Sequence, residues 1–318
     1  VNPIETMVGF NEQVKDRGIR MILMPTTIKP QIYADEMTVR CDDLTKPIQN
    51  PSYGEFLKRL DEAGVEAFDF SRTLFNFRRE GNQAFLKTDT HWTPEAMDRV
   101  AQDLVARIKR DDGWQPSERV LYSERPVKVT HLGDIAEMLK LPSDQEAYDP
   151  ETVEIYQVLG QKKMFWESSR SAPVLLMGDS FTNVFSLSEM GWGASAGLAE
   201  RVSYHLQCDV DRIAINAGGA FSTRQQLSRA LKRGEERLEG KKVVIWQFAM
   251  RELIEGNWRP LKIPMPHAAA FNDGMPATGE TRGGRYEVTG TVKGATEPPE
   301  PGTVPYEDCI VSIWLTDV

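Results

Sequence analysis

A short apolar run that ends in a turn motif constrains the fold of this chain most. Residues Pro173–Met177 (PVLLM) show no alternation of polar and apolar side chains, and Gly178-Asp179-Ser180-Phe181 follows them directly. A continuous apolar run with β-branched content predicts a buried central strand of a parallel sheet. Ligands bind at the carboxyl ends of such strands, so we expect Ser180 at a strand-to-helix turn on that edge.

A second motif, Asp89-Thr90-His91-Trp92, supplies the groups that a nucleophilic serine needs. Serine is a poor nucleophile near neutral pH and requires a base, which in turn requires an orienting partner. In an extended segment, residues two apart project to the same side, so Asp89 can accept from one imidazole nitrogen while the other faces Ser180. Thr93-Pro94-Glu95 predicts a helix start, and the helix is expected over Ala96–Lys109. We therefore predict a catalytic triad of Ser180, His91 and Asp89.

Each motif alone also has an ordinary structural interpretation. Gly-Asp-Ser is a common turn composition, and Asp-Thr-His occurs in capped loops with a structural histidine. The chain has four histidines, and of these His91 alone has an acid two positions earlier and a strong helix start after it. The joint occurrence of the two motifs favours the catalytic interpretation.

The two motifs together resemble the SGNH-hydrolase-like domain of alginate O-acetyltransferases of the AlgJ and AlgX type. In ordinary SGNH hydrolases the Gly-Asp-Ser block comes first and the dyad is Asp-x-x-His, whereas here the order is reversed and the dyad is Asp-x-His. Weaker similarities are Met24–Pro30, which contains Lys29, and Val243–Phe248 followed by Arg251. Gln247 stands where the resemblance implies an acid. The similarity covers roughly residues 5–256.

The resemblance implies a three-layer α/β fold with a central, mostly parallel sheet. It also implies an O-acetyltransferase that moves an acetyl group through Ser180 onto hydroxyls of an exported polysaccharide. A membrane-bound acyltransferase would be the partner that delivers acetyl groups, and the location would be periplasmic or otherwise exported. An SGNH-type carbohydrate esterase and a non-catalytic polysaccharide-binding scaffold remain open alternatives. No cofactor is expected.

Composition and charge narrow the class of protein further. The 318 residues are 40% hydrophobic and 27% charged, which is typical of a globular protein with one large core. No run approaches the ~20 apolar residues that span a bilayer. The net charge of −9 argues against nucleic-acid binding, and a strongly anionic polymer would require a local basic groove. Cys41, Cys208 and Cys309 show neither metal-ligand spacing nor a disulfide framework, so no metal is expected.

Strand and helix signals alternate along the first 258 residues, which we expect to form the catalytic domain. The polar stretch of residues 111–150 is expected to be irregular and to form an insertion or lid at the active-site edge. Because the chain begins at Val1, we expect a piece of a longer protein whose signal or anchor has been removed. The expected helices are residues 5–17, Tyr53–Ala63 and Thr223–Lys232, and the expected strands are Arg20–Pro25, Val65–Phe70, Val153–Val158, Val174–Met177, Arg212–Asn216 and Lys242–Phe248.

Residues 259–318 differ in character from the rest. Residues 261–283 are rich in Pro, Gly and Ala and predict a linker or extended arm, while Tyr286–Val292 and Ile310–Leu315 alternate as strands. Two strands do not make a stable domain on their own. A truncated β-rich accessory module and a hairpin packed on the main domain remain equally open.

Several further residues are candidates for the site. Gly218 and Gly219 follow a predicted strand, and glycines permit the close backbone approach that an oxyanion requires. Arg251 and Lys29 are candidates for substrate binding, and Trp92 and Trp246 for stacking on a sugar ring. The ordinary alternatives are a tight loop, a structural arginine and buried aromatic rings. Asp179 is expected to stabilise the turn.

Overall fold

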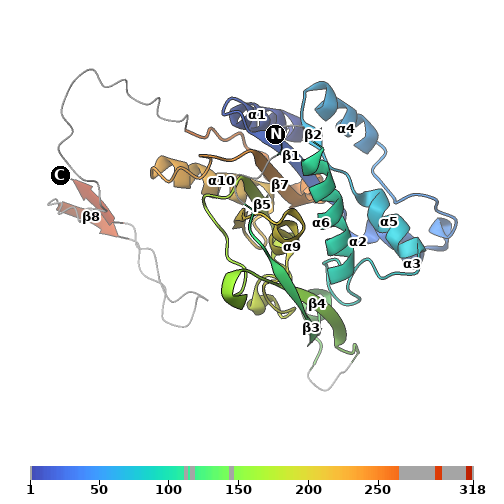
Figure 1. Cartoon of the computed structure of the whole chain (residues 1–318). Helices are drawn as coiled ribbons and strands as arrows, with labels where there is room; N and C mark the ends of the chain where they lie inside the picture. Colours follow the sequence, from blue (N-terminus) through green and yellow to red (C-terminus); the bar gives the residue numbers. More distant parts are fainter. Residues whose placement is uncertain are drawn as a thin grey trace. The chain divides into compact units, whose positions relative to one another are not determined.

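Five parallel strands form the central sheet of the computed structural model (Figure 1). Their order in the sheet is β2-β1-β7-β5-β6. The structure describes residues 2–110, 114, 119–142, 147–264, 291–295 and 313–316. The strands are β1 (Arg20–Thr26), β2 (Glu66–Ala67), β5 (Val174–Gly178), β6 (Val210–Ala214) and β7 (Val243–Ala249).

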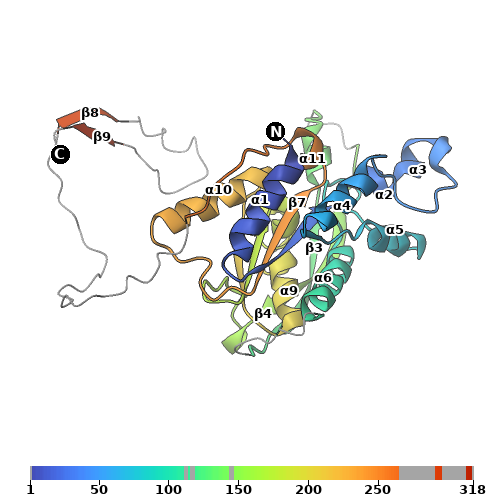
Figure 2. The ribbon, with the colours of Figure 1, turned by 90° about the horizontal axis from the view of Figure 1, so that it is seen from above.

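Helices cover both faces of this sheet, which gives three layers (Figure 2). Successive strand residues face opposite layers: Val243 and Ile245 of β7 belong to one apolar cluster, and Val244 and Trp246 to the other. Buried on both faces, β5 has the continuous apolar sequence expected of a central parallel strand. The helices of the first cluster are α5 (Ser71–Arg79), α6 (Pro94–Lys109) and α9 (Leu198–Leu206), and those of the second are α1 (Pro3–Lys15), α4 (Tyr53–Glu62) and α10 (Gly219–Lys232).

Helix α6 begins as its sequence predicts. Thr93 is the N-cap and its Oγ1 accepts a hydrogen bond from the Ala96 N–H, while Pro94 occupies the first turn. The apolar side of α6 is buried from Ala96 to Ile108. This packing fixes the position of the loop that precedes the helix and carries Asp89 and His91.

Two sequence predictions within this part of the fold are corrected. The strand expected at Val153–Val158 forms as β4 (Glu151–Leu159), but it pairs in an antiparallel hairpin with β3 (Ser123–His131) and lies outside the parallel sheet. The stretch expected to be irregular therefore contains β3 and the short helix α7 (Asp134–Met138). Only Val127 and Val129 of β3 pack against the core, and most of the other side chains are exposed, so the apolar signal of this strand is weak. Pro126 is tolerated because both strands of a hairpin are edges.

Smaller differences concern element ends. The strand expected over Val65–Phe70 is only the two residues of β2, and β6 begins two residues before its predicted start. The remaining short helices are α2 (Lys29–Ile32), α3 (Ala34–Met37), η1 (Val39–Cys41), η2 (Gln161–Lys163), α8 (Ser180–Asn183), η3 (Ser188–Met190) and α11 (Glu252–Glu255).

The chain divides into two units, residues 1–265 and 266–318. The start of the predicted linker belongs to the first unit, because the Ile263 N–H donates to Gln13 of α1 and the Ile263 side chain is buried. In the second unit, β8 (Thr291–Ala295) pairs antiparallel with β9 (Ile313–Thr316). The rest of the predicted linker and most of the two predicted C-terminal strands lie outside the described residues. No helix in the described ranges combines the length and apolar character needed to cross a membrane.

Candidate active site

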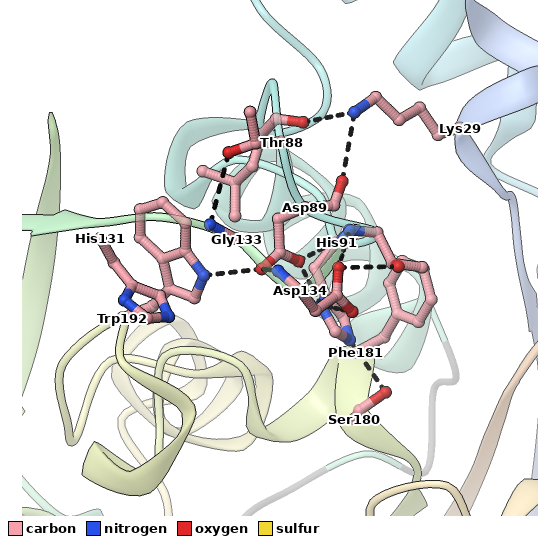
Figure 3. A network of polar contacts seen from close by, with 12 residues as sticks. Lys29, Thr88, Asp89, His91, His131, Gly133, Asp134, Ser180, Phe181 and Trp192 are labelled. Carbon is pink, nitrogen blue, oxygen red and sulfur yellow. Dashed lines mark hydrogen bonds and ion pairs between the residues drawn. The ribbon is translucent and has the colours of Figure 1, made fainter. Parts of the chain in front are cut away.

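Ser180, His91 and Asp89 lie in one line of hydrogen bonds (Figure 3). The Ser180 Oγ is 2.8 Å from His91 Nε2, and His91 Nδ1 is 2.6 Å from Asp89 Oδ1. The side chains of His91 and Asp89 are buried, whereas Ser180 is only half-buried. The half-buried Ser180 hydroxyl is hydrogen-bonded to the buried His91 imidazole, and the Asp89 carboxylate holds the other imidazole nitrogen. This is the geometry of an activated nucleophile.

The turn that carries Ser180 is fixed by the residue before it. Asp179 is the N-cap of α8, and its Oδ1 accepts from the Phe181 N–H at 2.9 Å. Its Oδ2 accepts from the Ala249 N–H at the end of β7 at 2.8 Å. Asp179 therefore joins two neighbouring strand ends, as expected for a turn-stabilising acid.

Gln247 completes this junction from β7. Its Oε1 accepts from the Asp179 N–H and from Thr182 Oγ1, each at 2.9 Å. Its Nε2 donates to Asp179 Oδ1 and to Thr26 Oγ1, again at 2.9 Å. An amide can both accept and donate here, whereas an acid would place a second carboxylate against Asp179. This network explains why glutamine fits at a position where the sequence resemblance implied an acid.

The Asp89 carboxylate has donors on both oxygens. Besides the imidazole, Oδ1 accepts from the His91 N–H, while Oδ2 accepts from Trp192 Nε1 at 2.8 Å and from the Asp134 N–H at 3.1 Å. Burial opposes the charged form, but the hydrogen bond and positive charge of His91, with the indole of Trp192, hold the pKa of Asp89 well below its ordinary value. Asp89 is therefore a fixed anion that orients the imidazole.

Lys29 anchors the loop that carries Asp89. Its Nζ donates to three backbone carbonyls, those of Leu86 and Lys87 at 2.7 Å and that of Asp89 at 3.2 Å. These three acceptors match the three donors of an ammonium group. Burial lowers the pKa of Lys29, and Asp89 is the first of the nearby carboxylates that oppose this shift. The structure therefore places Lys29 on the loop backbone, whereas the sequence suggested contact with substrate.

The two candidate tryptophans for sugar stacking lie in the core. Trp92 is fully buried against Phe70 and Phe181, and Trp246 is fully buried among Phe10, Phe248 and Trp258. A sugar ring stacks on an exposed aromatic face, and neither indole has one. The suggestion that Trp92 and Trp246 bind sugar is therefore corrected: both are packing residues.

The two glycines that were candidates for the oxyanion site, Gly218 and Gly219, lie at the start of α10. The Gly218 N–H donates to the Ile215 carbonyl within the turn. Gly219 has a φ of +55° and lies against the Glu252 carboxylate, which accepts from the Ala220 N–H at 3.2 Å. A carboxylate beside this turn disfavours a second anion there. Gly218 and Gly219 thus form the turn that starts α10 beside a carboxylate, and the expectation that they hold an oxyanion stays a prediction that nothing described at this turn supports.

Arg251 lies at the carboxyl end of β7. It lines a cavity of about 330 Å³ together with apolar side chains that include Ile28, Tyr53 and Met250. Met250 follows Ala249, whose N–H donates to Asp179, so this wall of the cavity lies at the carboxyl end of β7, near the turn that carries Ser180; Ser180, His91 and Asp89 are not among the lining residues. The location is compatible with substrate binding by Arg251.

The sequence reasoning missed Trp192 and Asp134, and it considered the turn that begins at Asn216 for its backbone N–H groups but not for the Asn216 side chain. Trp192 and Asp134 hold Asp89 from segments far away in the chain, and neither stands in a recognisable motif. Asn216 accepts at its Oδ1 from Asn183 Nδ2 at 2.8 Å, which places its amide beside α8. The only available signal for Trp192 was its position between two glycines, both of which have positive φ.

Asp89, His91 and Asp134 also form a group of possible metal ligands, since one donor atom of each lies within 4.8 Å of the others. The imidazole Nδ1 and both Asp89 oxygens are, however, already hydrogen-bonded within the protein. A cation would have to displace these bonds, so the donor set fits a histidine-orienting acid better than a metal site.

The three layers and the Ser-His-Asp line define an α/β protein with an SGNH-hydrolase-like domain. The sequence model of the family described as "SGNH hydrolase-like domain, acetyltransferase AlgX" matches residues 2–250. The chain therefore belongs to this family.

Curated relatives agree with this assignment. The "Probable alginate O-acetylase AlgJ" of Pseudomonas fluorescens is 24% identical over 260 residues, which are 78% of this chain and 61% of that protein. The protein of the same name from Azotobacter vinelandii is 23% identical over 254 residues, 77% of this chain and 61% of its own length. The chain thus spans about three fifths of the length of these relatives.

Solved structures show the same fold. The O-acetyltransferase domain of Pseudomonas putida AlgJ has a TM-score of 0.59 and 20% identity, covering 79% of this chain and 81% of that domain. Pseudomonas aeruginosa AlgX has a TM-score of 0.59 and 20% identity, covering 78% of this chain and 55% of AlgX.

Proposed function

We propose that this chain is an O-acetyltransferase that carries an acetyl group on Ser180 and passes it to a hydroxyl of a polysaccharide. The observation that carries the proposal is the hydrogen-bonded line from Ser180 through His91 to Asp89. The names of the relatives, alginate O-acetylase and O-acetyltransferase domain, support acetyl transfer as the reaction.

In the first half-reaction, Ser180 Oγ attacks the carbonyl carbon of an acetyl ester. His91 Nε2 takes the hydroxyl proton, and the Asp89 carboxylate stabilises the imidazolium that results. When the tetrahedral intermediate collapses, the bond to the donor oxygen breaks and His91 returns the proton to that leaving group. The product is acetyl-Ser180 with a neutral imidazole, ready to accept another proton.

In the second half-reaction, a sugar hydroxyl attacks the acetyl carbonyl while His91 takes its proton. Collapse of this intermediate releases the acetylated sugar and returns the proton to Ser180 Oγ. Water in place of the sugar gives acetate, which is the esterase alternative. The same triad serves both acceptors, so the choice between them depends on what the site binds beside Ser180.

The oxyanion of both intermediates needs donors at the start of α8. Within the described residues the Ser180 N–H has no acceptor, so it is available to the oxyanion. We assign the second donor to the side-chain amide of Asn216, whose Oδ1 is held by Asn183 three residues after Ser180 on the same helix. Each such donor contributes about 3–4 kcal/mol to acyl transfer in well-studied enzymes.

In this proposal, the substrate, the partner and the location are those that the family resemblance implies. The acceptor is an exported polysaccharide, with alginate suggested by the names of the relatives. The acetyl donor is supplied by a membrane-bound acyltransferase, and the protein acts in the periplasm or another exported compartment. Arg251 supplies a cation for an anionic sugar in a chain whose net charge is −9.

Product analysis with an activated acetyl ester tests the proposal. In the presence of an oligosaccharide, we expect acetyl groups on the sugar and a loss of this product in Ser180→Ala. Free acetate as the sole product, still dependent on Ser180, would support the esterase. A protein that binds the oligosaccharide but shows no Ser180-dependent turnover with any ester would support the scaffold alternative.

A further inference from the structure

A second carboxylate, that of Asp134, faces the imidazole of His91. Asp134 Oδ2 lies 4.0 Å from His91 Nδ1. The same nitrogen already donates a hydrogen bond to Asp89 Oδ1 at 2.6 Å. Nδ1 carries a single hydrogen, and Asp89 accepts it. Asp134 is therefore too far away to be the acceptor and acts on the ring through its charge.

The chain holds Asp134 in this position with a reciprocal set of hydrogen bonds. Asp134 Oδ1 accepts from the Thr90 N–H at 2.7 Å and from Thr90 Oγ1 at 2.9 Å. In return, the Asp134 N–H donates to Asp89 Oδ2, and the N–H groups of Ile135 and Ala136 donate to the Thr88 carbonyl. These hydrogen bonds thus join the start of α7 to the loop that carries Asp89 and His91 (Figure 3).

Gly133 makes the close approach of this junction to Asp89 possible. A Cβ at position 133 would lie 2.4 Å from Asp89 Cβ and 2.5 Å from the Thr88 carbonyl oxygen, so a larger residue cannot occupy this position without a shift of backbone. Asp134 follows directly. The Asp134 side chain is 36% exposed, so its carboxylate is accessible to solvent, whereas the Asp89 side chain is buried.

We propose that Asp134 is a second acid of the site, a positioning residue whose charge stabilises the His91 imidazolium while its Oδ1 pins Thr90. This inference rests on the proposed function. Two carboxylates on one imidazole favour its protonated form more than one does, because an opposite charge within about 4–6 Å stabilises the charged state. The imidazolium forms in both half-reactions, so the charge assists each of them.

Other charged groups near the ring do not replace Asp134. Asp89 is the direct partner of Nδ1, and Lys29 is held on the loop carbonyls on the other side of Asp89. Phe181 packs on the ring edge and contributes no charge. Glu137, on the same helix as Asp134, is 3.7 Å from His131 Nε2 and not near His91 in any described contact.

Asp134→Asn is the most informative variant because it removes the charge and keeps an oxygen that accepts from Thr90. Activity requires neutral His91 at the start of the reaction. Without the second charge the ring releases its proton at lower pH, so the acidic limb of the kcat/KM profile moves to lower pH by about half a unit to one unit. The plateau falls about 3- to 10-fold, because the imidazolium of the transition state is less stabilised.

Two matched variants separate charge from structure. Glu137→Gln removes a negative charge from the same helix and leaves the profile in place. Thr90→Val removes a hydrogen bond to Asp134 but keeps the charge, so its acidic limb stays in place even if its rate falls. An Asp134→Asn profile that coincides with that of Glu137→Gln would overturn the inference.

A titration of the His91 ring by NMR gives a readout that does not depend on turnover. We expect its midpoint to move to lower pH in Asp134→Asn and to be unchanged in Glu137→Gln. If the native protein shows no Ser180-dependent turnover but this shift is present, the proposed function fails and the electrostatic role of Asp134 stands. An unchanged midpoint in an active Asp134→Asn protein would overturn the role of Asp134 alone.

Discussion

The indole N–H of Trp192 donates to Asp89 Oδ2 at 2.8 Å, on the oxygen that does not face the imidazole. The indole is fully buried and comes from a loop 103 residues after Asp89. His131 of β3 packs edge-on against it with ring centroids 5.1 Å apart. The β3–β4 hairpin therefore supports the triad through Trp192.

Replacement of Trp192 by phenylalanine removes this donor and keeps an aromatic ring. We expect kcat/KM for acetyl transfer to fall about tenfold, because the loss of one hydrogen bond to a charged group costs roughly 1.5 kcal/mol. Trp92→Phe is the matched control: Trp92 is equally buried, but its Nε1 has no hydrogen-bond partner within the described structure. Equal losses of kcat/KM in both variants would show that ring volume, not the hydrogen bond, accounts for the effect.

Replacement of Gln247 by glutamate tests the junction around the nucleophile turn. The new carboxylate would face Asp179 Oδ1 with no donor between them. We expect the free energy of unfolding to fall by about 3 kcal/mol at neutral pH, and by less near pH 4, where one of the two acids is protonated. Urea denaturation at both pH values measures this difference. A Gln247→Glu protein as stable as the native one at pH 7 would contradict the network described for Asp179.

Variants of Lys29 test whether this residue anchors the loop that carries Asp89 or contacts the substrate. Lys29→Met removes the donors to three carbonyls of the loop. We expect kcat to fall about 10- to 100-fold through misplacement of Asp89 and His91, with little change of KM. Lys29→Arg, which keeps several donors, recovers part of this loss. A rise in KM with unchanged kcat would instead indicate that Lys29 binds substrate.

Acid stability depends on a cluster between α6 and α9. Asp98 Oδ1 is 2.6 Å from both Arg201 Nε and His205 Nε2. Burial opposes ionisation, but His205 and Arg201 outweigh it and lower the pKa of Asp98 to about 2. Because the folded pKa is depressed, this stabilisation is present above the unfolded value near pH 4 and is lost as the pH falls through about 2.

The expected contribution of this cluster is about 2 kcal/mol, since Asp98 is partly exposed. The difference in unfolding free energy between the native protein and Asp98→Asn should therefore be largest near pH 6 and shrink toward pH 2. Urea titrations at several pH values measure it. A difference that does not change with pH would mean that the Asp98 charge makes no contribution.

The parts of this fold that follow from local sequence were predicted well. The continuous apolar run of β5, the cap and proline of α6 and the Asp-x-His spacing each express a short-range rule, and the structure shows the expected strand, helix and hydrogen bonds. The tertiary fold then brings Ser180, at the carboxyl end of β5, to His91 across 89 residues. The sequence motifs alone indicated which residues meet, but not how they are supported.

The supporting residues could not be predicted because they depend on tertiary contacts. Trp192 and Asp134 contact Asp89 from distant segments. A tryptophan between two glycines and an aspartate at the start of a short helix have no distinctive local pattern. Helix α9 was not predicted because it buries Glu200 and Arg201 in ion pairs, which interrupts the apolar periodicity. Trp92 and Trp246 remained candidates for sugar stacking beside the alternative of buried rings, because sequence alone does not distinguish a buried aromatic ring from one that binds a ligand.

The central claim, that Ser180 carries the acetyl group, is tested most directly by intact-mass analysis after mixing with an activated acetyl ester. We predict that the native chain gains one acetyl group, that Ser180→Ala gains none, and that adding an oligosaccharide acceptor removes the group and transfers it to the sugar. His91→Gln, which keeps the serine without its base, should acylate far more slowly. An adduct of equal yield and rate in Ser180→Ala would contradict the account, as would turnover by the native chain that does not depend on Ser180.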